Sequence, residues 1–187
     1  MHNIDYLRAG KTPPLMLHLK YKFYEKTIYA LLKKTIGIEN GNFFPTAGAA
    51  VSDEICEFVH SVGINMVVGY GLTEPTATVS CFLDKGYEIG SVGTVMPDLE
   101  VKIGENNEIL LRGKTITTGY YKKPEATAAA IDKDGWFHTG DAGYLKGNHL
   151  YLTERIKDLF KTSNGKYISP QALETKLSID RYIDQIA

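Results

Sequence analysis

Hydrophobic positions in the first half of the chain follow two patterns in turn. Short apolar runs begin at Phe43 and cover 64–68, and both predict buried strands. Between them, apolar side chains recur at helical spacing after Ser52, an N-cap residue type, and stop before Gly63. A strand, a helix and a strand with short connections predict a parallel βαβ unit. The expected buried face of the helix carries Ile55, Phe58, Val59 and Val62.

An earlier stretch, residues 15–36, also has helical periodicity. It follows Pro13-Pro14, which predicts an extended backbone, and it stops at Gly37. Its lysines outnumber Glu25, and we interpret them as a solvated helix face; the alternative is contact with an anionic membrane surface. The apolar side chains that would form the other face are Leu15, Leu19, Phe23, Ile28, Leu31 and Leu32.

After about residue 82 the pattern changes to short strands separated by turns. Residues 104–107 form a hairpin connection, and Pro124 at N1 begins a short helix. A further hairpin is expected over 143–152. These elements predict a small antiparallel, β-barrel-like unit at 83–153. The strands expected before that hairpin are 90–95, 99–103, 108–112 and 115–118.

The last part of the chain, 154–187, begins with a charged joint at 155–158. A hairpin over 159–168 follows, and then a helix that Ser169-Pro170 begins. A hairpin and one helix do not build a stable core, so we expect the start of an α+β domain whose remainder is missing. The fold class is therefore α/β: a partial parallel α/β layer (1–82), the antiparallel unit, and this incomplete C-terminal domain.

Composition narrows the function classes. The chain has 187 residues with 21 basic and 22 acidic side chains, so no overall field favours nucleic acid as a partner. Cys56 and Cys81 lack metal-ligand spacing and suit a reducing compartment. We find no run of about 18 apolar residues and no signal peptide. A cytoplasmic protein is expected, with peripheral contact at the inner membrane face as the alternative that the lysine-rich helix leaves open.

The stretch 69–74 carries the side chains of a nucleotide site. Gly69 and Gly71 allow a sharp turn and close approach to a ligand, and Tyr70 offers a ring face on which a base stacks. Thr73 suits a phosphate oxygen, and the carboxylate of Glu74 suits Mg2+. Such groups at the C-terminal end of a strand are typical of α/β ligand sites. Taken alone, a motif this short is more often an ordinary loop.

A second polar cluster surrounds Asp141, which Gly140 and Gly143 bracket in an expected loop. A fixed carboxylate accepts hydrogen bonds from two vicinal hydroxyls, such as those of a ribose. Arg155 presents a planar fork to the same sugar or to a phosphate. Taken alone, an aspartate in a glycine-rich turn more often bonds its own backbone.

The order of the motifs is more specific than any one of them. Residues 69–74 come first, followed by the stretches 108–113, 119–127, 135–141 and 155–158. In this order, about residues 43–178 resemble the AMP-forming acyl-CoA synthetase superfamily, which also holds luciferases and nonribosomal adenylation domains. The amino-acid sequence of residues 155–170 is most similar to that of the long-chain fatty-acid–CoA ligases.

The resemblance implies a two-step reaction. A carboxylate attacks MgATP to give an acyl-adenylate and pyrophosphate, and the thiol of coenzyme A then displaces AMP. The implied substrate is a fatty acid or another carboxylic acid, and the implied cofactors are ATP/AMP, Mg2+ and coenzyme A. In the family, the C-terminal domain is a lid that rotates between the two steps.

The resemblance also assigns roles to individual residues. Thr73 and Glu74 would be catalytic, with Glu74 as the metal ligand, and Tyr70, flanked by Gly69 and Gly71, would stack on adenine. Asp141 and Arg155 would hold the ribose. The remaining assignments are Gly48, Ala49 and Ala50 beside the adenine and acyl pocket, Lys157 at the lid hinge and Gly165 beside the pantetheine arm.

Two parts of the family pattern do not occur in the sequence. Residues 1–42 contain no phosphate loop, and the family's catalytic lysine would fall after residue 187. We therefore expect a fragment that lacks the rest of its own N- and C-terminal domains and is inactive alone. Two alternatives stay open: an enzyme that loads an aryl or amino acid onto a carrier protein, and a non-catalytic nucleotide-binding or interaction module.

Overall fold

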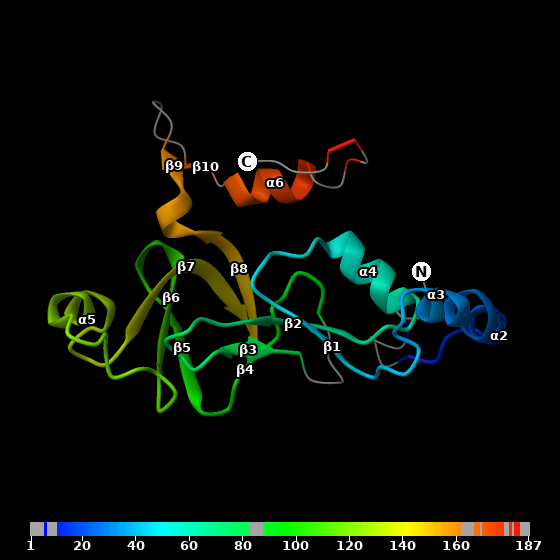
Figure 1. Cartoon of the computed structure of the whole chain (residues 1–187), viewed down its shortest axis with the longest axis horizontal. Coiled ribbons are helices and arrows are strands. Elements are labelled where there is room, and N and C mark those ends of the chain that lie inside the picture. The colour runs from blue at the N-terminus through cyan, green and yellow to red at the C-terminus, as the bar shows by residue number, and fades with distance from the viewer. Residues whose placement is uncertain are drawn as a thin grey trace.

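The computed structural model contains one eight-stranded sheet and helices at its two ends (Figure 1). It describes residues 6, 11–82, 88–161, 167–168, 170–177, 180 and 182–183. The strand order is β1-β2-β3-β4-β8-β7-β6-β5, and only β1 and β2 are parallel among these neighbours. The strands are β1 Phe44–Thr46, β2 Met66–Tyr70, β3 Ser80–Cys81, β4 Thr94–Val95, β5 Leu99–Ile103, β6 Glu108–Gly113, β7 Phe137–Lys146 and β8 His149–Arg155.

The predicted βαβ unit is confirmed, and the expected buried face of its helix is right in part: Val62 is buried and Val59 is half-buried. Helix α4, Asp53–Ser61, joins the parallel strands β1 and β2, and the Ser52 hydroxyl caps it by accepting from the N–H of Ile55 at 3.3 Å. Cys56 packs with β2, whereas Ile55 and Phe58 are 53% and 58% exposed. Cys56, which is not on the expected face, therefore takes part in the contact with β2 that is expected of Ile55 and Phe58.

The N-terminal helix is also confirmed, again with a different contact face. It consists of α2 Leu15–Tyr24, the π-helical turn η1 Glu25–Tyr29 and α3 Ala30–Thr35, and Gly37 with φ of +76° follows its end. The expected apolar face is exposed, with Leu15 at 75% and Leu31 at 65%. Instead, the ammonium of Lys33 donates to the carbonyl of Gly63 at 2.7 Å.

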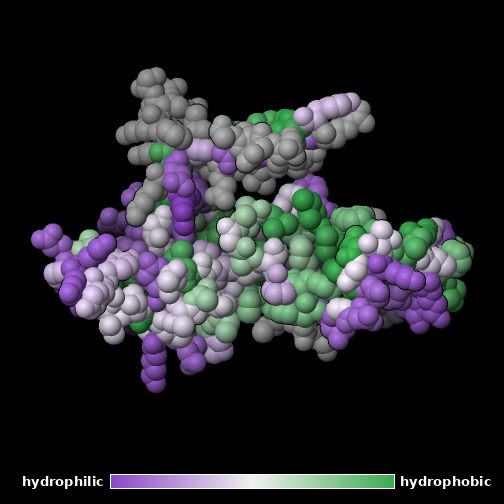
Figure 2. Space-filling model, viewed as in Figure 1, coloured by the Kyte–Doolittle hydropathy of each residue, from purple (hydrophilic) through white to green (hydrophobic). Residues whose placement is uncertain are grey.

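Apolar residues are therefore visible on the surface of the molecule at α4 and at the N-terminal helix (Figure 2). Within the described part of the chain, no helix is both long and apolar enough to cross a membrane.

The antiparallel hairpins lie where the sequence predicts them. Strands β5 and β6 pair with each other and are joined by the turn η2, Glu105–Asn107, and β7 pairs with β8. Helix α5, Pro124–Ala130, begins with proline in its first turn. Of the expected strand at 90–95, only β4 forms. It pairs with β3, so strands from both sides of the expected boundary at 82/83 belong to one sheet. The domain boundaries themselves stay a prediction.

The expected strand at 115–118 is wrong, and the reason lies in its hydrogen bonds. The carbonyl of Thr115 accepts from the hydroxyl of Thr76 at 2.7 Å, and the N–H of Thr117 donates to the carbonyl of Glu74 at 2.7 Å. The backbone of this segment therefore bonds the loop after β2 instead of a neighbouring strand.

Two motifs expected in loops lie inside strands. Gly69 and Tyr70 are the last residues of β2, and Gly69 pairs with Cys81 of β3. The turn therefore begins at Gly71, two residues later than predicted. Asp141 lies inside β7, where the register against β6 and β8 shifts and Gly140 has φ of +73°. A bulge permits these residues to stay within the sheet and still present an irregular backbone.

The C-terminal elements follow the prediction as far as they are described. The turn η3, Ile156–Asp158, leads to β9, Phe160–Lys161, which pairs antiparallel with β10, Tyr167–Ile168. Helix α6, Pro170–Leu177, follows. These elements stand on one side of the eight-stranded sheet (Figure 1). The expected N-cap Ser169 lies outside the described residues.

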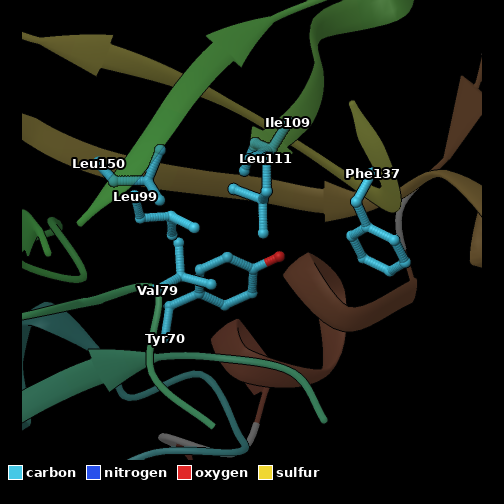
Figure 3. Close-up of a cluster of buried hydrophobic side chains, with 7 residues drawn as sticks. All are labelled: Tyr70, Val79, Leu99, Ile109, Leu111, Phe137 and Leu150. Atoms are coloured by element: carbon cyan, nitrogen blue, oxygen red, sulfur yellow. The ribbon is translucent and has the colours of Figure 1, made fainter. Parts of the chain in front are cut away.

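The main core joins β2 to the antiparallel strands. Figure 3 shows the ring of Tyr70 among side chains from β5, β6, β7 and β8 and from the loop after β2. Ile109, Leu111 and Leu150 are fully buried. The core therefore fixes the end of β2 relative to the bulge of β7. Its buried members are Tyr70, Val79, Leu99, Ile109, Leu111, Phe137 and Leu150.

The loop after Gly71 gives a first prediction. A Cβ on Gly71 would lie 1.5 Å from the carbonyl oxygen of Ala77, so Gly71→Ala has to displace backbone. We expect a loss of about 1–3 kcal/mol of unfolding free energy, as for other overpacked sites, measured by urea denaturation. Gly37→Ala is the reference for backbone strain without overlap, because the added Cβ meets open space but the positive φ costs about 1–2 kcal/mol; Gly71→Ala should lose more than this variant. Equal stability of Gly71→Ala and the wild type would contradict the close approach.

Candidate nucleotide site

An open groove of about 1320 Å³ lies between the loop after β2, helix α5 and strand β7. Its lining brings together five of the residues that the sequence marks as candidates: Gly48, Gly71, Thr73, Glu74 and Arg155. The remaining lining residues are Leu72, Thr76, Ala77, Glu108, Tyr120, Ala126, Ala129, Ala130, Phe137, His138, Thr139 and Gly140.

Asp141 is not among the lining residues itself, but it follows Gly140, which lines the groove, and it is held by two partners. Its Oδ2 accepts a hydrogen bond from the Tyr70 hydroxyl at 2.6 Å, and its Oδ1 accepts from Nε of Arg155 at 3.2 Å. The Cα atoms of Asp141 and Arg155 are register partners in β7 and β8. The carboxylate is buried, whereas the Arg155 side chain is 57% exposed. Each carboxylate oxygen keeps a second lone pair, so two acceptor positions remain.

Tyr70 is a buried hydrogen-bond donor in this structure. Burial, followed by the hydrogen bond to Asp141, raises the pKa of Tyr70 far above its usual value, so the phenol stays protonated. Its ring is 8% exposed and packs in the core, and Tyr70 is not among the residues that line the groove. The stacking role on adenine stays a prediction, and the side chain that the structure does place is the donor to Asp141.

Glu74 lines the groove at the other side of the same loop. Its Oε1 accepts from the Tyr120 hydroxyl at 2.8 Å, and this hydrogen bond is the main cause of the raised pKa of Tyr120. Thr73 beside it is exposed. Among the described residues, no three acidic, histidine or cysteine side chains gather as metal ligands. A single carboxylate nevertheless fits Mg2+, which commonly takes one or two protein carboxylates and completes its shell with phosphates and water.

Two site residues, Glu108 and His138, were not among the predicted ones. Glu108 begins β6, and its Oε1 accepts from the N–H of Gly140 at 3.0 Å. Its Oε2 lies 2.9 Å from Nδ1 of His138, and His138 donates this hydrogen bond in the tautomer that carries its proton on Nδ1. Both residues belong to stretches that the sequence marks, 108–113 and 135–141. Their chemistry depends on strand pairing, which the sequence alone does not show.

The remaining candidates do not all reach the groove. Gly48 lines it, whereas Ala49 and Ala50 are exposed beside it. Gly69 lies in β2, where a Cβ would approach the carbonyl of Ser80 at 3.3 Å. The backbone of Lys157 lies in η3, but its side chain is not described, and Gly165 lies outside the described residues.

Comparison with curated proteins finds fatty-acid ligases. Long-chain-fatty-acid–CoA ligase FadD15 of Mycobacterium bovis is 31% identical over 174 residues, which cover 92% of this chain and 29% of the relative. Long chain acyl-CoA synthetase 7, peroxisomal, of Arabidopsis thaliana is 31% identical over 192 residues, with 94% and 26% covered. The chain thus spans less than a third of the length of these relatives.

Solved structures with the same fold include ligases for other acids as well as a fatty acyl CoA synthetase of Mycobacterium tuberculosis. The wild-type E. coli MenE with a bound analogue of OSB-AMS is 29% identical, has a TM-score of 0.61, and matches 83% of this chain and 34% of its own. The o-succinylbenzoate CoA synthetase of Bacillus subtilis, in complex with the acyl-adenylate OSB-AMP, has a TM-score of 0.69 at 23% identity. It matches 77% of this chain and 32% of its own.

A model of a protein family also matches this chain. The model described as AMP-binding enzyme matches residues 12–121, which is more than half of the chain and includes the loop with Thr73 and Glu74. This match, the fatty-acid ligase relatives and the shared fold agree with the grouping of Asp141, Arg155 and Glu74 around one groove. The chain therefore belongs to the AMP-binding family of adenylate-forming ligases.

Proposed function

We propose that this chain forms the nucleotide wall of an AMP-forming fatty-acid–CoA ligase. The observation that carries the proposal is the buried carboxylate of Asp141, held by Tyr70 and by Arg155, which lines the same groove as Glu74. The fatty-acid substrate is supported by the long-chain-fatty-acid–CoA ligases among the relatives.

In the proposed first step, an oxygen of the acid's carboxylate attacks the α-phosphorus of ATP and pyrophosphate leaves. Asp141 accepts hydrogen bonds from the ribose hydroxyls through its free lone pairs and thereby fixes the nucleotide. Thr73 would donate its hydroxyl to a phosphate oxygen. Glu74 would hold Mg2+, and the chemistry that the ion would supply there is neutralisation of phosphate charge.

In the proposed second step, the thiol of coenzyme A attacks the acyl carbon, and AMP leaves with the bonding electron pair. The joint at η3 would serve as the hinge of the lid, with Lys157 in it and Gly165 near the pantetheine arm. This step needs the groove to keep AMP in place while the lid moves. The anchored pair of Asp141 and Arg155 suits that task, because both lie in the paired strands β7 and β8.

A second candidate function is activation of an aryl acid. It is favoured by the solved structures, which include o-succinylbenzoate and anthranilate CoA ligases. The nucleotide chemistry would be unchanged, and only the acid would differ.

The acid preference is tested in the full-length polypeptide that contains this chain. We expect exchange of labelled pyrophosphate into ATP to depend on a long-chain fatty acid and to be weak with o-succinylbenzoate or anthranilate. If only an aryl acid supports the exchange, the result would favour the second candidate, activation of an aryl acid, over the fatty-acid ligase. Absence of exchange with every acid, in a protein that folds, would contradict the ligase function.

The role of Asp141 is tested by titrating AMP into the Asp141→Ala variant of the same polypeptide. Loss of a charged hydrogen-bond acceptor should weaken AMP binding by about tenfold to a hundredfold. Calorimetry measures the affinity, and a melting curve checks the fold, because the buried Tyr70 hydroxyl also loses its acceptor. Asp134→Ala is the control, since Asp134 is an exposed carboxylate in the turn before β7. Equal AMP affinity in Asp141→Ala and wild type would remove Asp141 from the site.

The metal role of Glu74 is tested through the Mg2+ dependence of the exchange reaction. Glu74→Gln keeps the shape of the side chain but removes its charge, so the Mg2+ concentration for half-maximal exchange should rise about tenfold. Glu125→Gln, which alters an exposed carboxylate in the first turn of α5, should leave it unchanged. An unaltered Mg2+ requirement in Glu74→Gln would show that another group carries the metal.

A further inference from the structure

We infer that Glu108 is a positioning residue that holds the bulge of β7 in the conformation that aims Asp141 at the ribose. The inference rests on the proposed nucleotide function and adds to it a residue that acts without touching the nucleotide through its own carboxylate. It starts from the two hydrogen bonds of Glu108 and from the register shift they accompany.

The bulge has an unusual backbone that needs support. Gly140 has φ of +73°, and the pairing of β6 with β7 jumps from Glu108↔Ala142 to Leu110↔His138. The residues of β7 between these pairs therefore lack regular ladder partners on β6. A buried or half-buried N–H left without an acceptor is unfavourable, so the bulge persists only where side chains satisfy its backbone.

Glu108 supplies the acceptor at the centre of the bulge. Its Oε1 accepts from the N–H of Gly140 at 3.0 Å, and its Oε2 bonds Nδ1 of His138 at 2.9 Å. One carboxylate thus bonds both His138, at the start of the irregular segment, and Gly140, which has the positive φ. Only 20% of the Glu108 side chain is exposed, so water competes little for these bonds.

A second support acts on the neighbouring residue. The hydroxyl of Thr139 donates to the carbonyl of Ile109 at 2.8 Å and accepts from the N–H of Asp141 at 3.0 Å. Glu108 and Ile109 of β6 therefore fix the backbone on both sides of Gly140. With the backbone fixed, the Asp141 carboxylate meets Tyr70 and Arg155 and keeps its free lone pairs in one direction.

Loss of Glu108 should therefore leave the Asp141 carboxylate in the site but make its orientation less fixed. The readout is discrimination between AMP and 2′,3′-dideoxy-AMP, which lacks the hydroxyls that Asp141 would accept. In the full-length polypeptide, we expect wild type to prefer AMP by about tenfold or more. In Glu108→Ala, this preference should fall to about threefold or less, mainly through weaker binding of AMP.

Glu108→Gln should rescue the preference. Its amide oxygen can accept from the N–H of Gly140, and its amide nitrogen can donate to His138 in the other tautomer. Glu100→Ala is the matched control, because Glu100 is a carboxylate on the adjacent strand β5 whose partner is the exposed Arg112. It should keep the wild-type preference.

A readout without nucleotide separates this inference from the proposed function. Amide hydrogen exchange in a peptide covering 138–142 should become at least tenfold faster in Glu108→Ala and stay near wild type in Glu108→Gln. Unchanged exchange, or an equal loss of affinity for both nucleotides, would overturn the positioning role. A wild type that binds both nucleotides equally would instead overturn the ribose role of Asp141, while the exchange rates would still decide whether Glu108 holds the bulge.

Discussion

The structure depends on keeping one carboxylate charged inside a sheet. Asp141 is 7% exposed, and a buried charge is strongly unfavourable unless hydrogen bonds and an opposite charge compensate it. Tyr70 donates from the end of β2, and Arg155 donates from the end of β8. The two partners thus come from strands that are 85 residues apart in the chain (155 − 70). This requirement ties the parallel βαβ unit to the antiparallel hairpin, and the core around Tyr70 reinforces the same connection.

A second constraint is the closeness of two backbones after β2. Gly71 touches the carbonyl of Ala77, and the segment at 115–118 bonds the same loop through Thr76 and through the backbone of Glu74. The loop therefore has little freedom, although Thr73 and Glu74 within it carry the proposed chemistry. A rigid loop suits a site that must present a hydroxyl and a carboxylate to a charged ligand, because little ordering is then needed on binding.

The sequence predicts those features that depend on local chemistry. The strand–helix–strand unit, the N-cap at Ser52, the hairpin at 104–107 and the helix that starts at Pro124 all follow from residue types and spacing. The errors have a different origin. The expected strand at 115–118 bonds a distant loop, and Asp141 lies in a strand bulge because β6 and β8 pair on both sides of it. Glu108 acquires its partners through the same long-range pairing, so no periodicity could mark it.

The carboxylates around the groove differ in a way that bears on where a cation would bind. Of the two that line it, Glu108 has a protein partner on each oxygen, Gly140 and His138. Glu74 has one neutral partner, the Tyr120 hydroxyl at Oε1, and among the described residues its Oε2 has none. Asp141, which does not line the groove, already pairs with the guanidinium of Arg155. An added cation gains most from a carboxylate that has an oxygen without a partner and no protein cation beside it. Of these three, only Glu74 meets both conditions, so the hydrogen bonds and charges favour it over Glu108 and Asp141 as the proposed metal-binding carboxylate.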